Sequence, residues 1–141
     1  MEPITPYLNF NGDAAEALAF YAKAFDGEIV FQQTFGDAPP MEGADASWND
    51  KIMHATFQAG SLTLMASDVP NNMERVTAGS NTQLSLNFKH EEDIDRVYTA
   101  MSEGSKINMP LQDTFWGAKF GMLTDKWGIS WMFNFDRPKE G

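Results

Sequence analysis

The order of predicted secondary structure is repeated along the chain, and this repetition constrains the fold more than any other feature of the sequence. Leu8-Asn9-Phe10 recurs as Leu86-Asn87-Phe88, and Ile29 recurs at the same spacing as Ile107. In each half a strand pattern leads into a helix pattern, and three further strand patterns follow. The predicted strands cover residues 4–10, 28–35, 52–59 and 61–67 in the first half and 83–88, 106–111, 118–124 and 129–135 in the second. Such a duplicated unit is expected to pack as two halves that bury each other's apolar surface.

Two helices are predicted from apolar residues at helical spacing. The first follows Asn11-Gly12-Asp13 and ends near Gly27, and the second ends near Gly104. Acidic residues 91–93 suit the first turn of the second helix, where they interact favourably with its dipole. The apolar faces consist of Leu18, Tyr21 and Phe25 in the first helix and Ile94, Val97, Tyr98 and Met101 in the second.

The repeated pattern predicts an α+β fold of two βαβββ modules in a single domain. The modules cover residues 1–68 and 82–136, with a connector at 69–81 and a tail at 137–141. A chain of 141 residues that is 43% hydrophobic suits one domain with a sizeable core.

Charge and composition exclude several classes of function. The net charge of −10, with no cluster of Lys or Arg, argues against nucleic acid and membrane surfaces as partners. The absence of cysteine excludes disulfides, thiolate metal sites and a cysteine nucleophile. The first ten residues lack a basic start with a sustained apolar run, and no apolar stretch reaches the length of a membrane span. We therefore expect a cytoplasmic protein.

Aromatic residues gather in one predicted hairpin of the second half, residues 112–136. This segment holds three of the four tryptophans and four of the eleven phenylalanines. Asp125-Lys126-Trp127-Gly128 supplies the turn, and Trp116 stands at the entrance. Trp131 is expected in the core because it alternates with Met132, which faces the other way. Trp116 and Phe120 could either fill the core or line a pocket.

Strand alternation predicts one sheet face that is polar but uncharged. Its members are Thr5, Tyr7, Asn9, His54, Thr56, Gln58, Thr63, Met65, Ser67, Gln83, Ser85, Asn87, Ser130, Met132 and Asn134. A solvated face of a half-buried sheet is one interpretation. A cavity wall for a small polar or amphipathic molecule is the other, and the lack of Lys and Glu favours it.

A longer motif resembles a known family. The chain reads Asp113-x-Phe115-Trp116-Gly117-x-x-Phe120-Gly121, then Asp125-x-x-Gly128-x-x-Trp131-Met132-x-Asn134, together with Pro6-Tyr7, Phe20-Tyr21 and His54. This pattern is similar to the PhnB-like (3-demethylubiquinone methyltransferase-like) branch of the vicinal oxygen chelate superfamily, which includes glyoxalases, bleomycin resistance proteins and dioxygenases. The resemblance implies a curved mixed sheet around a cavity, helices on the outer face, and a homodimer.

The resemblance also allows metal chemistry to be examined position by position. The places where metal-dependent relatives carry ligands correspond here to Thr5 or Pro6, to Met65 within about one residue, to Gln83 and to Met132. Of these only Gln83 could be a ligand. Thioethers are poor ligands for Mg, Mn, Ni or Zn. No Gly-rich strand-to-helix turn of the kind used for nucleotide-like cofactors is present either. We therefore predict no metal and no cofactor, with a set of His54, Gln83 and Tyr7 as the alternative.

His54 is the one plausible general base, because the other histidine, His90, lies in a charged segment. It could act as a base, as a donor that orients a ligand, or as a neutral histidine bonded on the sheet. Residues predicted to bind the ligand are Tyr7, Gln83, Trp116, Phe120, Met132 and Asn134. The loop at 36–51, with Pro39, Pro40, Met41 and Trp48, could be a lid or a dimer contact.

The sequence thus predicts a glyoxalase/bleomycin-resistance-like protein that binds a small organic molecule in its cavity without a metal. The alternative is a metal-dependent lyase, isomerase or dioxygenase that uses His54 and Gln83. A third interpretation is a module for protein interaction. Whether any reaction is catalysed stays open at this level.

Overall fold

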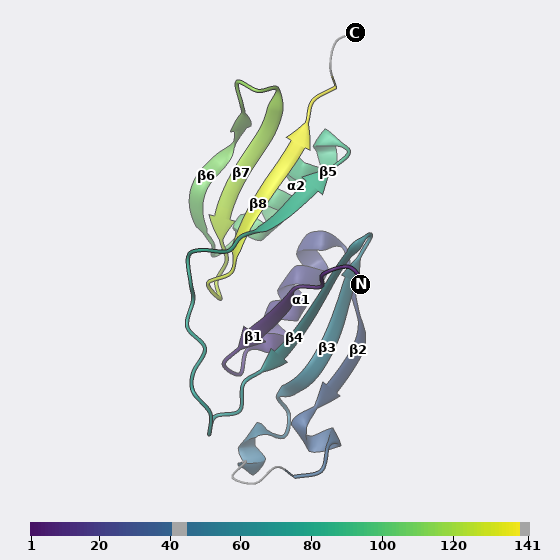
Figure 1. Ribbon diagram of the computed structural model, residues 1–141, viewed down its shortest axis with the longest axis vertical. Coiled ribbons are helices and arrows are strands. Elements are labelled where there is room, and N and C mark those ends of the chain that lie inside the picture. Colours follow the sequence, from purple (N-terminus) through teal and green to yellow (C-terminus); the bar gives the residue numbers. More distant parts are fainter. Residues whose placement is uncertain (41–44, 139–141) are drawn as a thin grey trace. The chain divides into compact units, whose positions relative to one another are not determined.

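The structure, a computed structural model, describes residues 1–40 and 45–138. It divides into two compact units, Met1–Thr77 and Ala78–Gly141, and each contains one βαβββ module (Figure 1). The first unit contains β1 (Tyr7–Phe10), α1 (Ala14–Phe25), β2 (Glu28–Thr34), β3 (Ile52–Ala59) and β4 (Leu62–Asp68), with 3₁₀ turns at Phe35–Asp37 and Ala46–Trp48. The second contains β5 (Leu84–Phe88), α2 (Glu91–Ser102), β6 (Lys106–Asp113), β7 (Ala118–Thr124) and β8 (Ser130–Asp136). The α+β fold with two βαβββ modules is confirmed.

Each unit has a four-stranded mixed sheet of the same topology. The strand orders are β1-β4-β3-β2 and β5-β8-β7-β6. The first strand of each unit pairs in parallel with the last, and the other pairs are antiparallel. In the parallel pairs Tyr7 lies opposite Met65 and Ser85 lies opposite Met132, so the two methionines occupy equivalent places in the two modules.

The first strand of each module is shorter than the sequence predicts. β1 begins at Tyr7 rather than at Ile4, and β5 begins at Leu84 rather than at Gln83. Pro6 has no N–H to donate to a ladder, although its carbonyl accepts a hydrogen bond from Met65 N at 3.0 Å. Thr5 and Gln83 therefore lie just before the strands on which they were expected.

Other predicted strand bounds are also wrong. β4 and β8 each begin and end one residue later than the sequence predicts, and the ends of β2 and β6 differ as well. β2 ends at Thr34, where the backbone N–H and the hydroxyl both donate to the carboxylate of Asp37 at 3.0 Å and turn the chain into the 3₁₀ segment. β6 continues to Asp113, past the predicted end at Leu111.

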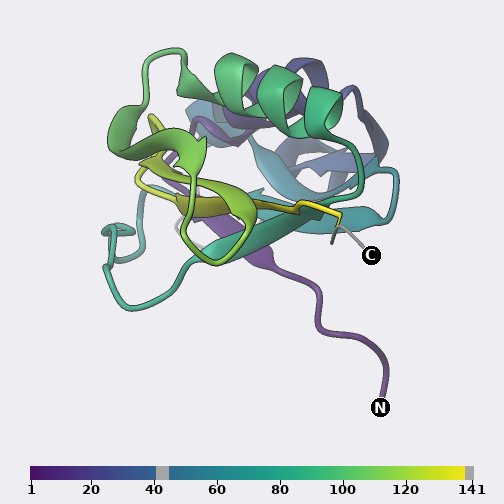
Figure 2. The same ribbon diagram turned by 90° about the horizontal axis from the view of Figure 1, so that it is seen from above.

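A helix covers one face of each sheet (Figure 2). The buried apolar residues of the first unit are Leu8, Phe10, Ala14, Ala17, Leu18, Tyr21, Ala24, Ile52, Ala55, Phe57, Leu64 and Ala66. Those of the second unit are Ile94, Val97, Tyr98, Met101, Ala118, Leu123, Trp131, Phe133 and Phe135. Trp131 is fully buried, which confirms its predicted place in the core. Among the described residues, no α-helix of its own unit lies on the opposite face of either sheet.

Asp68, at the end of β4, holds the start of α1 in place. Its side chain is buried, and Oδ1 accepts hydrogen bonds from Gly12 N and Ala14 N, both at 2.9 Å. Oδ2 accepts a third from Ile52 N at 2.9 Å. Asp13, the residue at the N-cap position, makes no capping bond with its own side chain. The helix is therefore capped from a distant strand, which joins β1, α1, β3 and β4 at one point.

In the second unit, the carboxylate of Asp125 accepts three hydrogen bonds at the turn of the aromatic hairpin, as that of Asp68 does at the start of α1. It is buried, and its Oδ1 accepts from Trp127 N and Ile129 N, both at 3.0 Å. Its Oδ2 accepts from the indole Nε1 of Trp131 at 2.9 Å. The turn closes at Gly128, whose φ of +85° favours glycine. The predicted turn at residues 125–128 is confirmed, and its carboxylate also anchors the largest side chain of the core.

Charged side chains join α2 to the strands beside it. Glu91 accepts hydrogen bonds from Arg137 Nη1 at 3.1 Å and Nη2 at 2.8 Å, and from Lys119 Nζ at 3.2 Å. Lys119 also pairs with Asp95, and Arg137 with Asp113. The hydrogen bonds from Arg137 and then Lys119 hold the pKa of Glu91 below its ordinary value.

We expect Glu91→Gln to lower Tm by about 1–4 °C at pH 7, since the pairs are partly exposed. The pKa of Glu91 is lower in the folded than in the unfolded protein, so Glu91 stabilises the fold fully above the ordinary pKa of a glutamate. This stabilisation is lost as the pH falls through the folded-state pKa. Thermal unfolding of the wild type and of Glu91→Gln between neutral and acid pH measures whether their Tm values converge as the pH falls. Glu92→Gln, on the same helical turn, is the control; a pH-independent difference for Glu91→Gln would contradict the assignment.

Among the described residues, none of the helices combines the length and the apolar character needed to cross a bilayer.

Candidate functional site

The helix-free face of the first sheet carries an uncharged row across all four strands. Tyr7 lies opposite Met65, Met65 opposite Thr56, and Thr56 opposite Phe31. His54 projects from β3 two residues before Thr56 and therefore on the same face. Tyr7 and Phe31 keep 43% and 50% of their surface exposed. Large rings exposed together on a sheet face form a surface suited to a flat ligand.

The side chains of Tyr7 and Phe31 both lie against that of His54, and we call the three residues the His54 cluster. The Tyr7 hydroxyl lies 3.1 Å from Nδ1 of His54, and the two rings stack with centroids 5.7 Å apart. The centroid of the Phe31 ring also lies 5.9 Å from that of the imidazole. If the Tyr7 hydroxyl donates to Nδ1, the neutral imidazole carries its proton on Nε2, which is then a hydrogen-bond donor. The cluster therefore offers apolar ring surface beside one polar donor.

Phe31 was missed by sequence reasoning. β2 contains a register shift between Ile29 and Phe31, so simple alternation from the start of the strand puts Phe31 on the wrong face. No sequence signal marks this bulge, and only the pairing of Phe31 with Thr56 reveals it.

The helix-free face of the second sheet carries a row of methionines. Met132 lies opposite Ser85 on one side and Met122 on the other, and Met122 lies opposite Met109. Sequence reasoning identified Met132 and missed Met122 and Met109, which the cross-strand register brings beside it. Thioether side chains are flexible and adapt to ligands of different shape.

The next row of this face is formed by amides and one ring. Asn134 lies between Asn87 and Phe120, and Phe120 lies opposite Gln112. The amide of Asn134 donates to Asn87 Oδ1 at 3.4 Å and to Asp136 Oδ1 at 3.2 Å.

Trp116, in the loop between β6 and β7, packs against Phe120. Their ring centroids lie 6.3 Å apart, and Phe115 meets Trp116 edge-on at 5.0 Å. Trp116 is 58% exposed and Phe115 is 97% exposed within this structure. The structure therefore brings two of the predicted binding residues together, at an exposed aromatic corner of the second sheet.

The predicted site residues fall into two groups. Tyr7 and His54 belong to the first unit, while Gln83, Trp116, Phe120, Met132 and Asn134 belong to the second. Within each group the members lie on or beside the helix-free face, and Gln83 lies exposed just before β5. Their roles in binding stay predictions.

The donor set at the superfamily's metal positions does not fit a resident divalent ion. Two of the four places carry thioethers, Met65 and Met132, and Thr5 offers only a hydroxyl. Over residues 1–40 and 45–138, moreover, no group of three or more His, Asp or Glu side chains is arranged to hold a metal. A ligand pair of His54 and Gln83 stays a prediction, as the alternative to a site without metal.

The long loop after β2 is only partly described. Pro39, Pro40 and Trp48 line a cavity of the first unit, whereas Met41 lies outside the described residues. The role of the loop at residues 36–51 as a lid or a dimer contact stays a prediction.

Comparison with known proteins identifies the relatives of this chain. Residues 2–133 match the family described as 3-demethylubiquinone-9 3-methyltransferase. The chain is 31% identical to protein YjdN of Escherichia coli over 94% of both chains. The crystal structure of protein PA1353 from Pseudomonas aeruginosa is similar at 38% identity and a TM-score of 0.84, covering 98% of this chain and all of that one.

Two further solved structures are similar to this chain, one as a relative in sequence and one in fold alone. A PhnB protein from Bacillus cereus, a putative 3-demethylubiquinone-9 3-methyltransferase, shares 31% identity at a TM-score of 0.76 over 95% of this chain and 99% of its own. The fold alone is shared with the fosfomycin resistance protein FosX of Mesorhizobium loti, at 12% identity and a TM-score of 0.62 over 96% of this chain and 92% of its own. These matches confirm the resemblance carried by the motif around Trp116. The chain therefore belongs to the PhnB-like family described as 3-demethylubiquinone-9 3-methyltransferase.

Proposed function

We propose that this protein binds a small, flat organic molecule without a metal, and that the His54 cluster on the first sheet is a principal contact. The observation that carries the proposal is the exposed Tyr7–His54 pair, bonded at 3.1 Å and flanked by the Phe31 ring. Ring surface binds an aromatic or conjugated body, and the imidazole N–H donates to a carbonyl or similar acceptor on the ligand. These contacts are sufficient for a protein that sequesters a small molecule.

The helix-free face of the second sheet also offers apolar surface and hydrogen-bonding groups to a ligand. Trp116 and Phe120 offer ring surface, Met132 offers an adaptable apolar side chain, and Asn134 and Gln83 offer amides. Apolar surface with a few polar groups is typical of small-molecule sites. We propose that these five residues also contact a ligand.

The family's name refers to methyl transfer, and the strand-to-helix turns of this chain do not favour a nucleotide-like methyl donor. Such cofactors bind their anionic groups at free N–H groups of a helix start. At α1 the N–H groups of Gly12 and Ala14 already donate to Asp68. At α2 the first turn is acidic, with Glu91, Glu92 and Asp93. Binding without methyl transfer therefore agrees better with these residues.

The proposal predicts that His54→Ala weakens binding about tenfold or more, because it removes both a stacking ring and a hydrogen-bond donor. Aromatic and conjugated compounds would first be screened by ligand-observed NMR. The affinity of each compound that binds would then be measured for the wild type, His54→Ala and Trp116→Ala. His90→Ala removes the other histidine, at the start of α2, and is expected to leave every affinity unchanged.

Unchanged affinities in both His54→Ala and Trp116→Ala would overturn the proposal. The metal alternative is tested on the same samples by titration with Ni, Mn, Zn and Fe(II) followed by tryptophan fluorescence. Stoichiometric metal binding that is lost in His54→Ala and in Gln83→Ala would support the metal-dependent enzyme instead. We expect none.

A further inference from the structure

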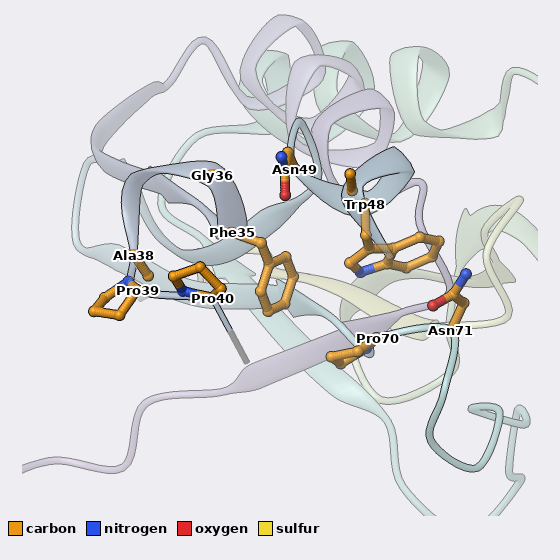
Figure 3. A pocket seen from close by; sticks show the side chains of 10 residues that line it. Phe35, Gly36, Ala38, Pro39, Pro40, Trp48, Asn49, Pro70 and Asn71 are labelled. Atoms are coloured by element: carbon orange, nitrogen blue, oxygen red, sulfur yellow. The ribbon is translucent and has the colours of Figure 1, made fainter. Parts of the chain in front are cut away.

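A cavity of about 230 Å³ lies in the first unit, and the residues described as lining it include none of the His54 cluster (Figure 3). Among the described residues it is lined by Phe35, Gly36, Ala38, Pro39, Pro40, Ala46, Trp48, Asn49, Pro70 and Asn71. None of these residues is charged, and most are apolar. A volume below the roughly 300–1,000 Å³ of sites for drug-sized molecules suits a compound with a single ring.

One buried polar atom of the lining lacks a partner. Within the described part of the chain, the indole Nε1 of Trp48 is buried and makes no hydrogen bond. Figure 3 shows this nitrogen on the edge of the ring that is turned toward Phe35 and Pro40, across the cavity. An indole N–H can only donate, and burying it unpaired costs free energy. A hydrogen-bond acceptor inside the cavity would remove that cost.

The Trp48 ring is held in this orientation by its surroundings. A side chain at Gly12 would meet Cη2 of Trp48 at 3.0 Å, so the ring edge packs closely on the bare backbone there. Nζ of Lys51 lies 5.9 Å from the ring centroid. The backbone on either side is fixed by Trp48 N donating to Asp45 O at 2.9 Å and Lys51 N donating to Trp48 O at 3.0 Å.

The opposite wall of the cavity is fixed in a similar way. Phe35 N donates to Lys51 O at 3.0 Å, and Gly36 N donates to Asn49 O at 2.8 Å. A side chain at Gly36 would approach Asn49 O to 2.9 Å, so this close contact requires glycine. The two 3₁₀ turns are thereby joined, and the cavity between them has walls with a defined spacing.

We infer that this cavity is a second binding site, distinct from the His54 cluster, for a small neutral molecule with one ring and a carbonyl-type acceptor. The ring packs between Phe35 and the prolines, and the acceptor receives the hydrogen bond from Nε1 of Trp48. The described part of the lining is uncharged, so it favours a neutral molecule over a carboxylate or an ammonium group, whose desolvation it would not offset.

Acetophenone and ethylbenzene test the inference, because they have nearly the same shape and only the first has an acceptor. Both would be titrated into ¹⁵N-labelled full-length protein, with the indole N–H signal of Trp48 assigned by its loss in Trp48→Phe. We expect acetophenone to shift this signal at millimolar concentration and to bind about 3- to 10-fold more tightly than ethylbenzene. In Trp48→Phe, which keeps a ring but removes the donor, the preference should disappear.

Trp127→Phe, in the hairpin turn of the second unit, is the matched control and should keep the preference for acetophenone. Three results would overturn the inference: no shift of the Trp48 signal with either compound, equal affinities in the wild type, or a preference that survives in Trp48→Phe. If Trp48→Phe does not fold, the Trp48 signal is assigned instead by nuclear Overhauser effects within the wild type, where the two compounds are still compared.

Discussion

Replacing Asp68 by alanine is expected to lower the free energy of unfolding by about 3–5 kcal/mol. The carboxylate accepts three backbone hydrogen bonds, from Gly12, Ala14 and Ile52, and its side chain is buried. Alanine would leave all three N–H groups without a partner, and two of these bonds lie in buried surroundings. Denaturant unfolding at neutral pH, followed by circular dichroism, measures the loss.

Asp68→Asn distinguishes the hydrogen bonds from Gly12 and Ala14 from the one donated by Ile52. An amide oxygen can still accept from Gly12 and Ala14, whereas the amide nitrogen would face the N–H of Ile52, so an intermediate loss of about 1–3 kcal/mol is expected. Asp136→Ala removes an exposed aspartate at the end of β8 and should change stability by no more than about 0.5 kcal/mol. A loss of less than about 1 kcal/mol in Asp68→Ala would show that this carboxylate does not organise the start of α1.

Replacing Asp125 by alanine is expected to cost about 3–4 kcal/mol, for a related reason in the other unit. Asp125 accepts from the backbone of Trp127 and Ile129 and from the indole of Trp131, which is fully buried. The loss should appear in denaturant unfolding. It should also reduce the near-ultraviolet circular dichroism, because the Trp131 ring loses its fixed orientation.

A double-mutant cycle tests the hydrogen bond from the indole of Trp131 to Asp125. In Asp125→Asn the amide nitrogen would face the N–H of Trp131, a contact between two donors that Trp131→Phe removes. We therefore expect Asp125→Asn to cost about 1–2 kcal/mol less in the Trp131→Phe background than in the wild type. Trp127→Phe keeps its backbone donor to Asp125 and should have a small effect. Strict additivity of Asp125→Asn and Trp131→Phe would argue against the bond.

Elements with strong local patterns were predicted well. The bounds of β3 and β7 agree with the sequence prediction at both ends, and the turn at residues 125–128 was also correct. In each case alternating apolar residues and turn-forming residues lie close together in the chain, so the local conformational preference and the final fold agree.

Predictions failed where a distant residue decides the outcome. Asn11-Gly12-Asp13 marked the start of α1 correctly, yet the capping group is Asp68, which lies 54 residues beyond Ala14. Phe31 was missed because a bulge in β2 changes the face of every residue after it. The row of Met109, Met122 and Met132 could not be derived either, because it depends on the register between three strands.

The sequence by itself determined the order of elements, the repeated βαβββ module, the α+β class and the family, because periodicity and turn chemistry are local properties. Only the tertiary structure decided which side chains meet. Tyr7 and His54 are 47 residues apart and touch through the pairing of β1, β4 and β3. The unpaired Trp48 indole faces a cavity only because two 3₁₀ turns are joined by backbone hydrogen bonds. Such contacts depend on strand register and loop closure, which no local pattern of residues encodes.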